Sequence, residues 1–196
     1  EVKTPKYFDS KELSAIYTPY HYPATDNQFK GRNVVIIVTE SISAENSAYL
    51  CPEIYKDEQQ KGYTPFLDSL MQNGYAFRRM YANGKRSIQA LPSVWGSIPS
   101  LATPFVLMPQ SLGESRPLPM LLKERGYSTA FFCGSERGSM GFDAYAISAG
   151  FDRCLSKEDY EKAHGYNDFD GYWGIWDDKF LSFMGEQIDT LSEPFL

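Results

Sequence analysis

A carboxylate stands at the end of an apolar run early in the chain. Glu40 comes after Val34–Val38, a continuous run of β-branched residues that is typical of a strand buried on both faces of a sheet. Thr39, Ser41 and Ser43 concentrate further oxygen atoms around this carboxylate. Because hard divalent cations prefer such oxygen ligands, Glu40 is a candidate metal ligand. The alternative is a solvated loop residue, as most acidic side chains are.

A second segment places a hydroxyl behind two cations. Ser87 follows Lys85 and Arg86 in a turn that contains Gly84, and it opens a segment expected to be helical. A serine hydroxyl becomes a nucleophile when a base, a metal or a lowered pKa activates it. Arginine binds phosphate or sulfate oxygens in a fork geometry, and N–H groups at the start of a helix favour the same anions. Ser87 is therefore a candidate nucleophile, with Lys85 and Arg86 as anion-binding residues; the alternative is an N-cap serine beside two solvated cations.

Helical and strand patterns alternate along the rest of the chain. We expect helices near residues 10–17, 64–73, 87–97, 117–125, 142–149 and 177–191, and strands at 34–38, 75–81 and 128–133. Pro92 must lie in the first turn of its helix or kink it, and residues 194–196 look like the start of a further strand. Such alternation indicates an α/β fold, a mostly parallel sheet with helices on both faces. Ligands bind beyond the carboxyl ends of such strands, where Glu40 and the glycine-rich loop 134–141 both fall.

The composition of the 196-residue chain fits one soluble globular domain, with 42% hydrophobic and 22% charged residues. The net charge is −6 and no basic face is visible, which argues against nucleic-acid binding. No run of about 18 apolar residues exists, so no segment of this sequence is expected to span a membrane. The three cysteines, Cys51, Cys133 and Cys154, show no CxxC spacing and indicate neither a disulfide framework nor a zinc site.

Several short motifs follow one another in a single order between residues 33 and 196. They lie at residues 35–41, 62–68, 83–87, 98–101, 141–143, 170–175 and 194–195. Together they resemble the sulfatase-like branch of the alkaline phosphatase superfamily, and within it the lipoteichoic acid synthase-like proteins. The resemblance implies a truncated parallel-sheet α/β fold, in which residues 33–196 are the N-terminal portion of a catalytic domain. It also implies that residues 1–32 are an extended lead-in from upstream membrane helices, with the catalytic domain outside the cytoplasm.

The resemblance also assigns roles to the residues singled out above. In the family the strand-end Glu, here Glu40, is a metal ligand. The Ser or Thr after a short basic turn, here Ser87, is the metal-bound nucleophile that becomes covalently substituted. The cation is often manganese, magnesium or zinc. The implied reaction has two steps, attack by Ser87 and then transfer to water or an acceptor hydroxyl, with Arg86 stabilising charge on the ester oxygens.

Three features depart from the family pattern. The remaining metal ligands are an Asp-His pair from a later segment, and neither histidine of this chain follows an Asp, so this chain alone is expected to turn over little substrate. Lipoteichoic acid synthases place a Trp and an Arg for glycerol phosphate where Met140 and Phe142 stand here, and Arg137 is the residue that could compensate. The box at residues 97–101 resembles the modified site of true sulfatases but has Leu where an Arg is needed, which argues against formylglycine chemistry.

These features predict a metal-dependent phosphodiester transferase or hydrolase that acts on an envelope lipid or glycan. Trp173 is a candidate for lining a lipid or sugar groove, with aromatic packing beneath a loop as the alternative. Two other functions stay open, a sulfate-ester hydrolase that uses unmodified Ser87 and an envelope binding module that has lost its metal. The joint presence of Glu40 and Ser87 favours the enzyme.

Overall fold

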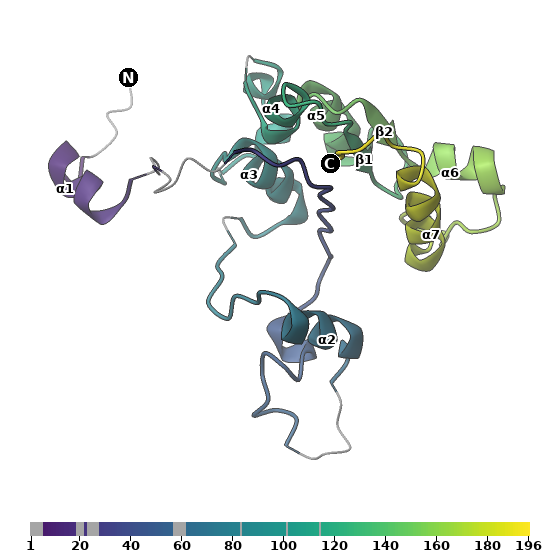
Figure 1. The fold of residues 1–196 in the computed structure, drawn as a ribbon, viewed down its shortest axis with the longest axis horizontal. Coiled ribbons are helices and arrows are strands. Elements are labelled where there is room, and N and C mark those ends of the chain that lie inside the picture. Colours follow the sequence, from purple (N-terminus) through teal and green to yellow (C-terminus); the bar gives the residue numbers. More distant parts are fainter. Residues whose placement is uncertain are drawn as a thin grey trace. The chain divides into compact units, whose positions relative to one another are not determined.

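The structure is a computed structural model that describes residues 6–18, 22, 28–56, 62–82, 84–100, 102–113 and 115–196 (Figure 1). Three positions used above, His21, Asn83 and Leu101, lie outside these described residues. The chain divides into two compact units, Glu1–Lys30 and Gly31–Leu196. In the first, helix α1 (Ser10–Ile16) begins at Asp9, whose carboxylate accepts hydrogen bonds from the N–H groups of Lys11 and Glu12. This capping box accounts for the helix predicted near residues 10–17, which is confirmed.

The second unit holds the other helices. They are α2 (Pro65–Asn73), α3 (Ala90–Gly96), α4 (Leu118–Lys123), α5 (Phe142–Ser148), α6 (Lys157–His164) and α7 (Asp177–Ile188), with short 3₁₀ helices at Ala44–Asn46, Ser87–Gln89, Phe105–Leu107, Pro109–Leu112 and Ser139–Gly141. The helices predicted in this unit are confirmed, and Pro92 lies in the first turn of α3, where a proline is tolerated. Helix α6 was not predicted, because its mostly charged sequence has no apolar stripe; a capping box between Ser156 and Asp159 starts it instead.

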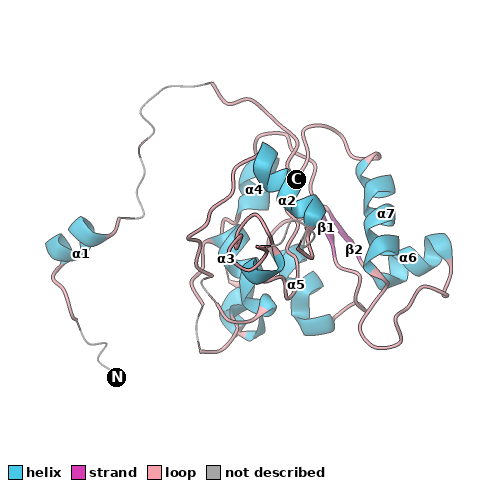
Figure 2. Ribbon diagram, turned by 90° about the horizontal axis from the view of Figure 1, so that it is seen from below, coloured by secondary structure: helices cyan, strands magenta, loops and turns pink. Residues whose placement is uncertain are grey.

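Two short parallel strands form the centre of the second unit. β1 (Ala130–Phe132) and β2 (Arg153–Leu155) pair with Phe131 opposite Cys154. Figure 2 shows them side by side, with α3, α4 and α5 on one side and α6 and α7 on the other. The buried strand predicted at 128–133 is confirmed, and so is the α/β fold class with a parallel sheet flanked by helices.

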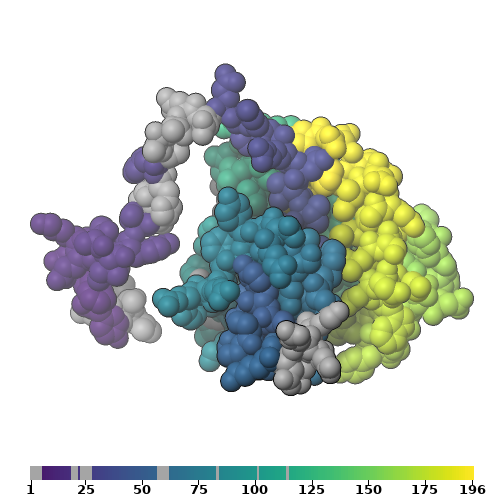
Figure 3. All heavy atoms as spheres, turned by 60° about the horizontal axis from the view of Figure 1, so that its bottom comes forward, coloured from purple at the N-terminus to yellow at the C-terminus, as the bar shows by residue number. Residues whose placement is uncertain are grey.

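The C-terminal segment extends the same ladder. Leu196 donates its N–H to the carbonyl of Ser128 at 3.0 Å, and its own carbonyl accepts from the N–H of Ala130 at 2.9 Å. Val34 in turn donates its N–H to the carbonyl of Phe195 at 2.8 Å. In Figure 3 the blue-violet atoms at the start of this unit accordingly lie against the yellow C-terminal segment. The strand-like continuation predicted at 194–196 is therefore confirmed.

One face of the sheet packs against α3 and α5. Its buried cluster contains Ile88, Leu91, Trp95, Tyr127, Phe142, Tyr145, Ala146, Ala149, Phe151 and Leu196. The ring of Trp95 lies 5.3 Å from that of Phe131 in an edge-on arrangement, which aromatic pairs prefer. Because Ile88 and Leu91 follow Ser87 closely, this cluster anchors the segment that carries the candidate nucleophile.

The opposite face packs against α6 and α7, with Tyr160, Ile175, Phe180 and Phe183 buried between them. The hydroxyl of Tyr160 donates to Asp168 at 2.8 Å, and burial together with this carboxylate raises the pKa of Tyr160 to about 12. His164 is exposed; its ring stacks on Tyr160, and its Nε2 lies 2.9 Å from a carboxylate oxygen of Glu186. Aromatic packing and one polar contact therefore join α6 to α7.

Two of the predicted strands are wrong in this structure. The run Val34–Val38 forms no strand, and Val35 and Ile37 are 52% and 60% exposed. Residues 75–81 form none either, and Tyr75 is 99% exposed. A strand requires backbone partners along its length, and no described residue pairs its backbone with residues 35–38 or 75–81.

Candidate functional site

The side chain of Gln89 organises the turn before Ser87. Its Oε1 accepts hydrogen bonds from the backbone N–H groups of Lys85 at 2.9 Å and Arg86 at 3.2 Å. Gln89 is only 8% exposed, so this acceptor is held in the interior. Gly84 lies so close that a Cβ atom there would stand 2.6 Å from Oε1, which explains the glycine in this turn. The turn and its glycine were read from the sequence, whereas Gln89 was missed.

Ser87 begins a 3₁₀ helix that leads directly into α3. Its carbonyl accepts from the N–H of Ala90, and the buried side chain of Ile88 follows it at 6% exposure. Ser87 is half-buried, while Lys85 and Arg86 are exposed. The predicted helical start at Ser87 is confirmed. The turn therefore presents one hydroxyl and two cations at the edge of the core.

Glu40 lies at a sharp bend in the chain. One of its carboxylate oxygens accepts from the hydroxyl of Ser41 at 3.0 Å, and Glu40 itself is exposed. Ser41 has φ +56°, a left-handed conformation that non-glycine residues rarely adopt. Ser43 then caps a 3₁₀ helix by accepting from the N–H of Glu45 at 3.3 Å. A carboxylate at the end of the apolar run is therefore present, and its role as a metal ligand stays a prediction.

A buried carboxylate ties the segment after Glu40 to α2. Asp68 is 7% exposed and accepts from the hydroxyl of Ser47 at 2.5 Å and the N–H of Ala48 at 3.1 Å. The hydroxyl of Thr64 lies 3.3 Å from the same carboxylate. Thr64 and Asp68 lie four residues apart at the start of α2, whereas the contact with Ser47 joins residues that are 21 positions apart.

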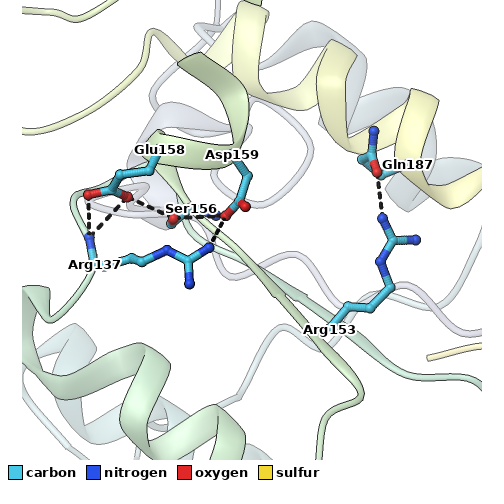
Figure 4. A network of polar contacts seen from close by, with 6 residues as sticks. All are labelled: Arg137, Arg153, Ser156, Glu158, Asp159 and Gln187. Atoms are coloured by element: carbon cyan, nitrogen blue, oxygen red, sulfur yellow. Dashed lines mark hydrogen bonds and ion pairs between the residues drawn. The ribbon is translucent and has the colours of Figure 1, made fainter. Parts of the chain in front are cut away.

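Arg137 lies in the loop after β1 and is bound to the start of α6 (Figure 4). Its backbone N–H donates to both carboxylate oxygens of Glu158, and its guanidinium donates to Asp159 at 2.6 Å. Ser156 donates to the same two carboxylates. Burial raises the pKa of Asp159, but hydrogen bonds from Ser156 and Arg137 outweigh it and lower that pKa below its usual value. Substrate binding by Arg137 stays a prediction, since its guanidinium already has a carboxylate partner.

A small cavity lies beside Arg137, at the carboxyl ends of β1 and β2. Its lining includes Cys133, Ser135, Asp143 and Cys154, and its volume of about 30 Å³ suits about one water molecule. One carboxylate oxygen of Asp143 is buried and has no hydrogen-bond partner among the described residues. Burial raises the pKa of the Cys154 thiol, which disfavours a reactive thiolate. None of the three cysteines of the chain forms a disulfide bond.

Trp173 lies in a turn built around Asp170. One carboxylate oxygen of Asp170 accepts from the N–H groups of Tyr172, Trp173 and Gly174 at 2.8, 2.7 and 3.1 Å. These backbone hydrogen bonds lower the pKa of Asp170, which acts as a turn residue. The Trp173 residue is 50% exposed. Its place in a substrate groove stays a prediction.

The grouping of these candidate residues in one site stays a prediction. Lys85, Arg86 and Ser87 share one turn, but no hydrogen bond or ion pair among the described residues joins that turn to Glu40, Arg137 or Trp173. No three His, Cys, Asp or Glu side chains of the described ranges form a group that could hold a metal. Zinc takes four ligands and magnesium about six, so Glu40 and Ser87 alone do not fill either coordination shell. The described residues therefore do not complete a metal site.

Solved structures share this fold. A protein of the alkaline phosphatase superfamily from Vibrio parahaemolyticus is 28% identical, with a TM-score of 0.72 over 86% of this chain and 40% of that one. The lipoteichoic acid synthase LtaP from Listeria monocytogenes is 21% identical, with a TM-score of 0.61 over 82% of this chain and 38% of that one, which shows the fold alone. The chain thus spans about two fifths of the length of the solved structures it matches.

The chain belongs to the Sulfatase family, whose family model matches residues 32–196. The resemblance to the alkaline phosphatase superfamily and its sulfatase-like branch is therefore confirmed. Within the described ranges, none of the helices combines the length and the apolar character needed to cross a membrane.

Proposed function

We propose that this chain, as part of the complete protein, supplies the nucleophile of a phosphodiester transferase or hydrolase that acts on an envelope lipid or glycan. The observation that carries the proposal is the turn at residues 84–87, which Gln89 holds on the core and which presents a hydroxyl between exposed cations and a buried helix. Membership of the Sulfatase family supports ester chemistry at this hydroxyl. Anchoring by upstream membrane helices and a location outside the cytoplasm belong to the same proposal and rest on the resemblance alone.

The proposed reaction consists of two displacements at phosphorus. In the first, Oγ of Ser87 forms a bond to phosphorus while the bond to the leaving alcohol breaks, and the hydroxyl proton ends on that alcohol. In the second, water or an acceptor hydroxyl displaces Ser87, which regains a proton. Arg86 and Lys85 are exposed beside Ser87, so they can stabilise the anionic oxygens in both steps.

A divalent cation, either manganese, magnesium or zinc, is proposed because members of this superfamily typically use divalent metals. When bound, such a cation lowers the pKa of a coordinated hydroxyl and polarises the ester. Glu40 is the proposed ligand from the strand-end position, with Ser87 as the coordinated hydroxyl. Because the described residues do not complete a site, further ligands would come from outside them.

Replacing Ser87 in the complete protein tests the proposal. Ser87→Ala is expected to lower the turnover of bis-p-nitrophenyl phosphate by at least about a thousand-fold, because no other group then becomes covalently substituted. Ser69→Ala, at an exposed position on α2, is the matched control and should retain parental turnover. Mass spectrometry of the quenched enzyme should find the substituted serine in the peptide that contains Ser87. Unchanged turnover in Ser87→Ala would overturn the proposed function.

A sulfate-ester hydrolase is the second candidate, favoured by membership of the Sulfatase family. The same preparation is assayed with p-nitrophenyl sulfate and with bis-p-nitrophenyl phosphate. Faster turnover of the sulfate ester would favour the sulfate-ester hydrolase, and faster turnover of the phosphodiester would favour the phosphodiester enzyme. A binding module without catalysis is the third reading. If the enzyme is correct, Glu40→Ala should lower the metal content of the complete protein. Equal metal content in the parent and in Glu40→Ala, without turnover of either ester, would favour the binding module.

A further inference from the structure

Gln89 is a buried residue whose bonds are directed at the backbone of the candidate nucleophile's turn. Its Oε1 is the common acceptor for the N–H groups of Lys85 and Arg86, the two residues that precede Ser87. Its own N–H donates to the carbonyl of Arg86 at 2.9 Å, so side chain and main chain of Gln89 both hold the turn. Such a pattern fixes the path of the backbone into Ser87.

Gln89 can do this because the core fixes its position. Its neighbour Ile88 is 6% exposed. Leu91, two residues after Gln89, is 9% exposed and lies in the same cluster as Trp95. The acceptor oxygen is therefore held by a rigid element, whereas Lys85 and Arg86 are exposed and have no such packing. A displacement of a reacting group by about 1 Å can lower a rate by about a hundred-fold, so this kind of support matters for catalysis.

The neutral charge of Gln89 has a second consequence. Neither Lys85 nor Arg86 forms an ion pair with a described residue. A carboxylate at position 89 would accept the same two backbone N–H groups but would also attract these cations and repel an anionic ester. An amide oxygen holds the turn while it leaves both cations available to a substrate.

We infer that Gln89 is a positioning residue for Ser87, an uncharged acceptor that fixes the turn and keeps Lys85 and Arg86 available for the substrate anion. This inference rests on the function proposed above. It separates two properties of position 89, the acceptor and the absence of charge. Each property has its own kinetic consequence and can be removed by itself.

Steady-state kinetics of the complete protein with bis-p-nitrophenyl phosphate test the inference. Gln89→Leu keeps the size of the side chain but removes the acceptor, and it should lower kcat by at least about tenfold with KM within about twofold. Gln89→Glu keeps the acceptor and adds a charge, so kcat should stay within about threefold while KM rises at least about fivefold. Gln72→Leu, at an exposed position on α2, should match the parent in both constants.

The outcomes separate this inference from the proposed function. If Ser87→Ala is inactive while Gln89→Leu keeps the parental kcat, the positioning role is overturned and the proposed function stands. If Ser87→Ala is fully active, the proposed function fails together with the inference. Equal loss of kcat in the Leu and Glu variants would also overturn it, because the acceptor would then have no part in the effect.

A second variant covers the case in which Gln89→Leu does not fold. Gly84→Ala places a Cβ atom where only 2.6 Å separates it from Oε1 of Gln89, and position 84 has no left-handed backbone of its own to strain. It should therefore displace Gln89 and lower kcat in the same way. Because the added Cβ also stands 2.7 Å from Cβ of the buried Gln89, the thermal midpoint should fall as well, and kcat is measured well below that midpoint. A parental kcat in Gly84→Ala would overturn the inference.

Discussion

The two parts of the second unit differ in how their apolar side chains are covered. In residues 115–196 the sheet has apolar clusters on both faces, and Phe183 is only 2% exposed. In residues 34–82 Ile37 and Tyr75 are 60% and 99% exposed, and α2 buries no apolar side chain. Both parts carry apolar runs that predict strands. The comparison shows that such a run becomes a strand only where another segment supplies backbone hydrogen bonds and a covering face.

Truncation of a large side chain in each part should sharpen this comparison most. Phe183→Ala should lower the free energy of unfolding by about 3–5 kcal/mol, because it leaves a cavity between α6 and α7. Phe66→Ala, at a position that is 72% exposed, should change it by less than about 0.5 kcal/mol. Urea unfolding followed by circular dichroism measures both. Similar losses in the two variants would show that residues 34–82 are as well covered as the sheet.

The buried carboxylate of Asp68 should be the main stabilising contact of the less covered part. Asp68→Ala leaves the hydroxyl of Ser47 and the N–H of Ala48 without their acceptor, at a cost of about 1–3 kcal/mol. Asp189→Ala, an exposed carboxylate at the end of α7, serves as its control and should be nearly neutral. Proteolysis between residues 40 and 75 should accelerate in the first variant only. Unchanged proteolysis would mean that α2 and the segment after Glu40 are held by other contacts.

Acid should lower the stability of residues 115–196 through Asp152. The expected change in the free energy of unfolding is smaller than that in Asp68→Ala. Burial raises the pKa of Asp152, but bonds from Lys123 and Thr129 outweigh it and lower that pKa below its usual value. A carboxyl whose folded pKa is lowered stabilises the fold above its unfolded pKa and loses this contribution as pH falls through the folded pKa. Stability should therefore fall as the pH drops below about 4, and less steeply in Asp152→Asn. Urea midpoints between pH 7 and pH 2 check this; parallel curves for the two proteins would contradict it.

The prediction of the candidate site succeeded where its signals were local. Ser87 opens a helix and Gly84 stands in a tight turn, both of which follow from spacing and residue type over a few positions. Gln89 stands three residues after the N-cap position Arg86, a spacing typical of a capping box, and this signal could have identified it. The partner of Arg137 had no such signal, since Asp159 lies 22 residues further along the chain.

The sequence by itself determined the helices other than α6, the α/β class, the turn before Ser87 and the family, because hydrogen bonds within four residues and short motifs encode them. Only the tertiary structure decided which apolar runs pair as strands and which carboxylate binds Arg137. The physical reason is that these contacts join residues far apart in the sequence. Whether they form depends on which segments fold against one another, and no pattern within a single segment contains that information.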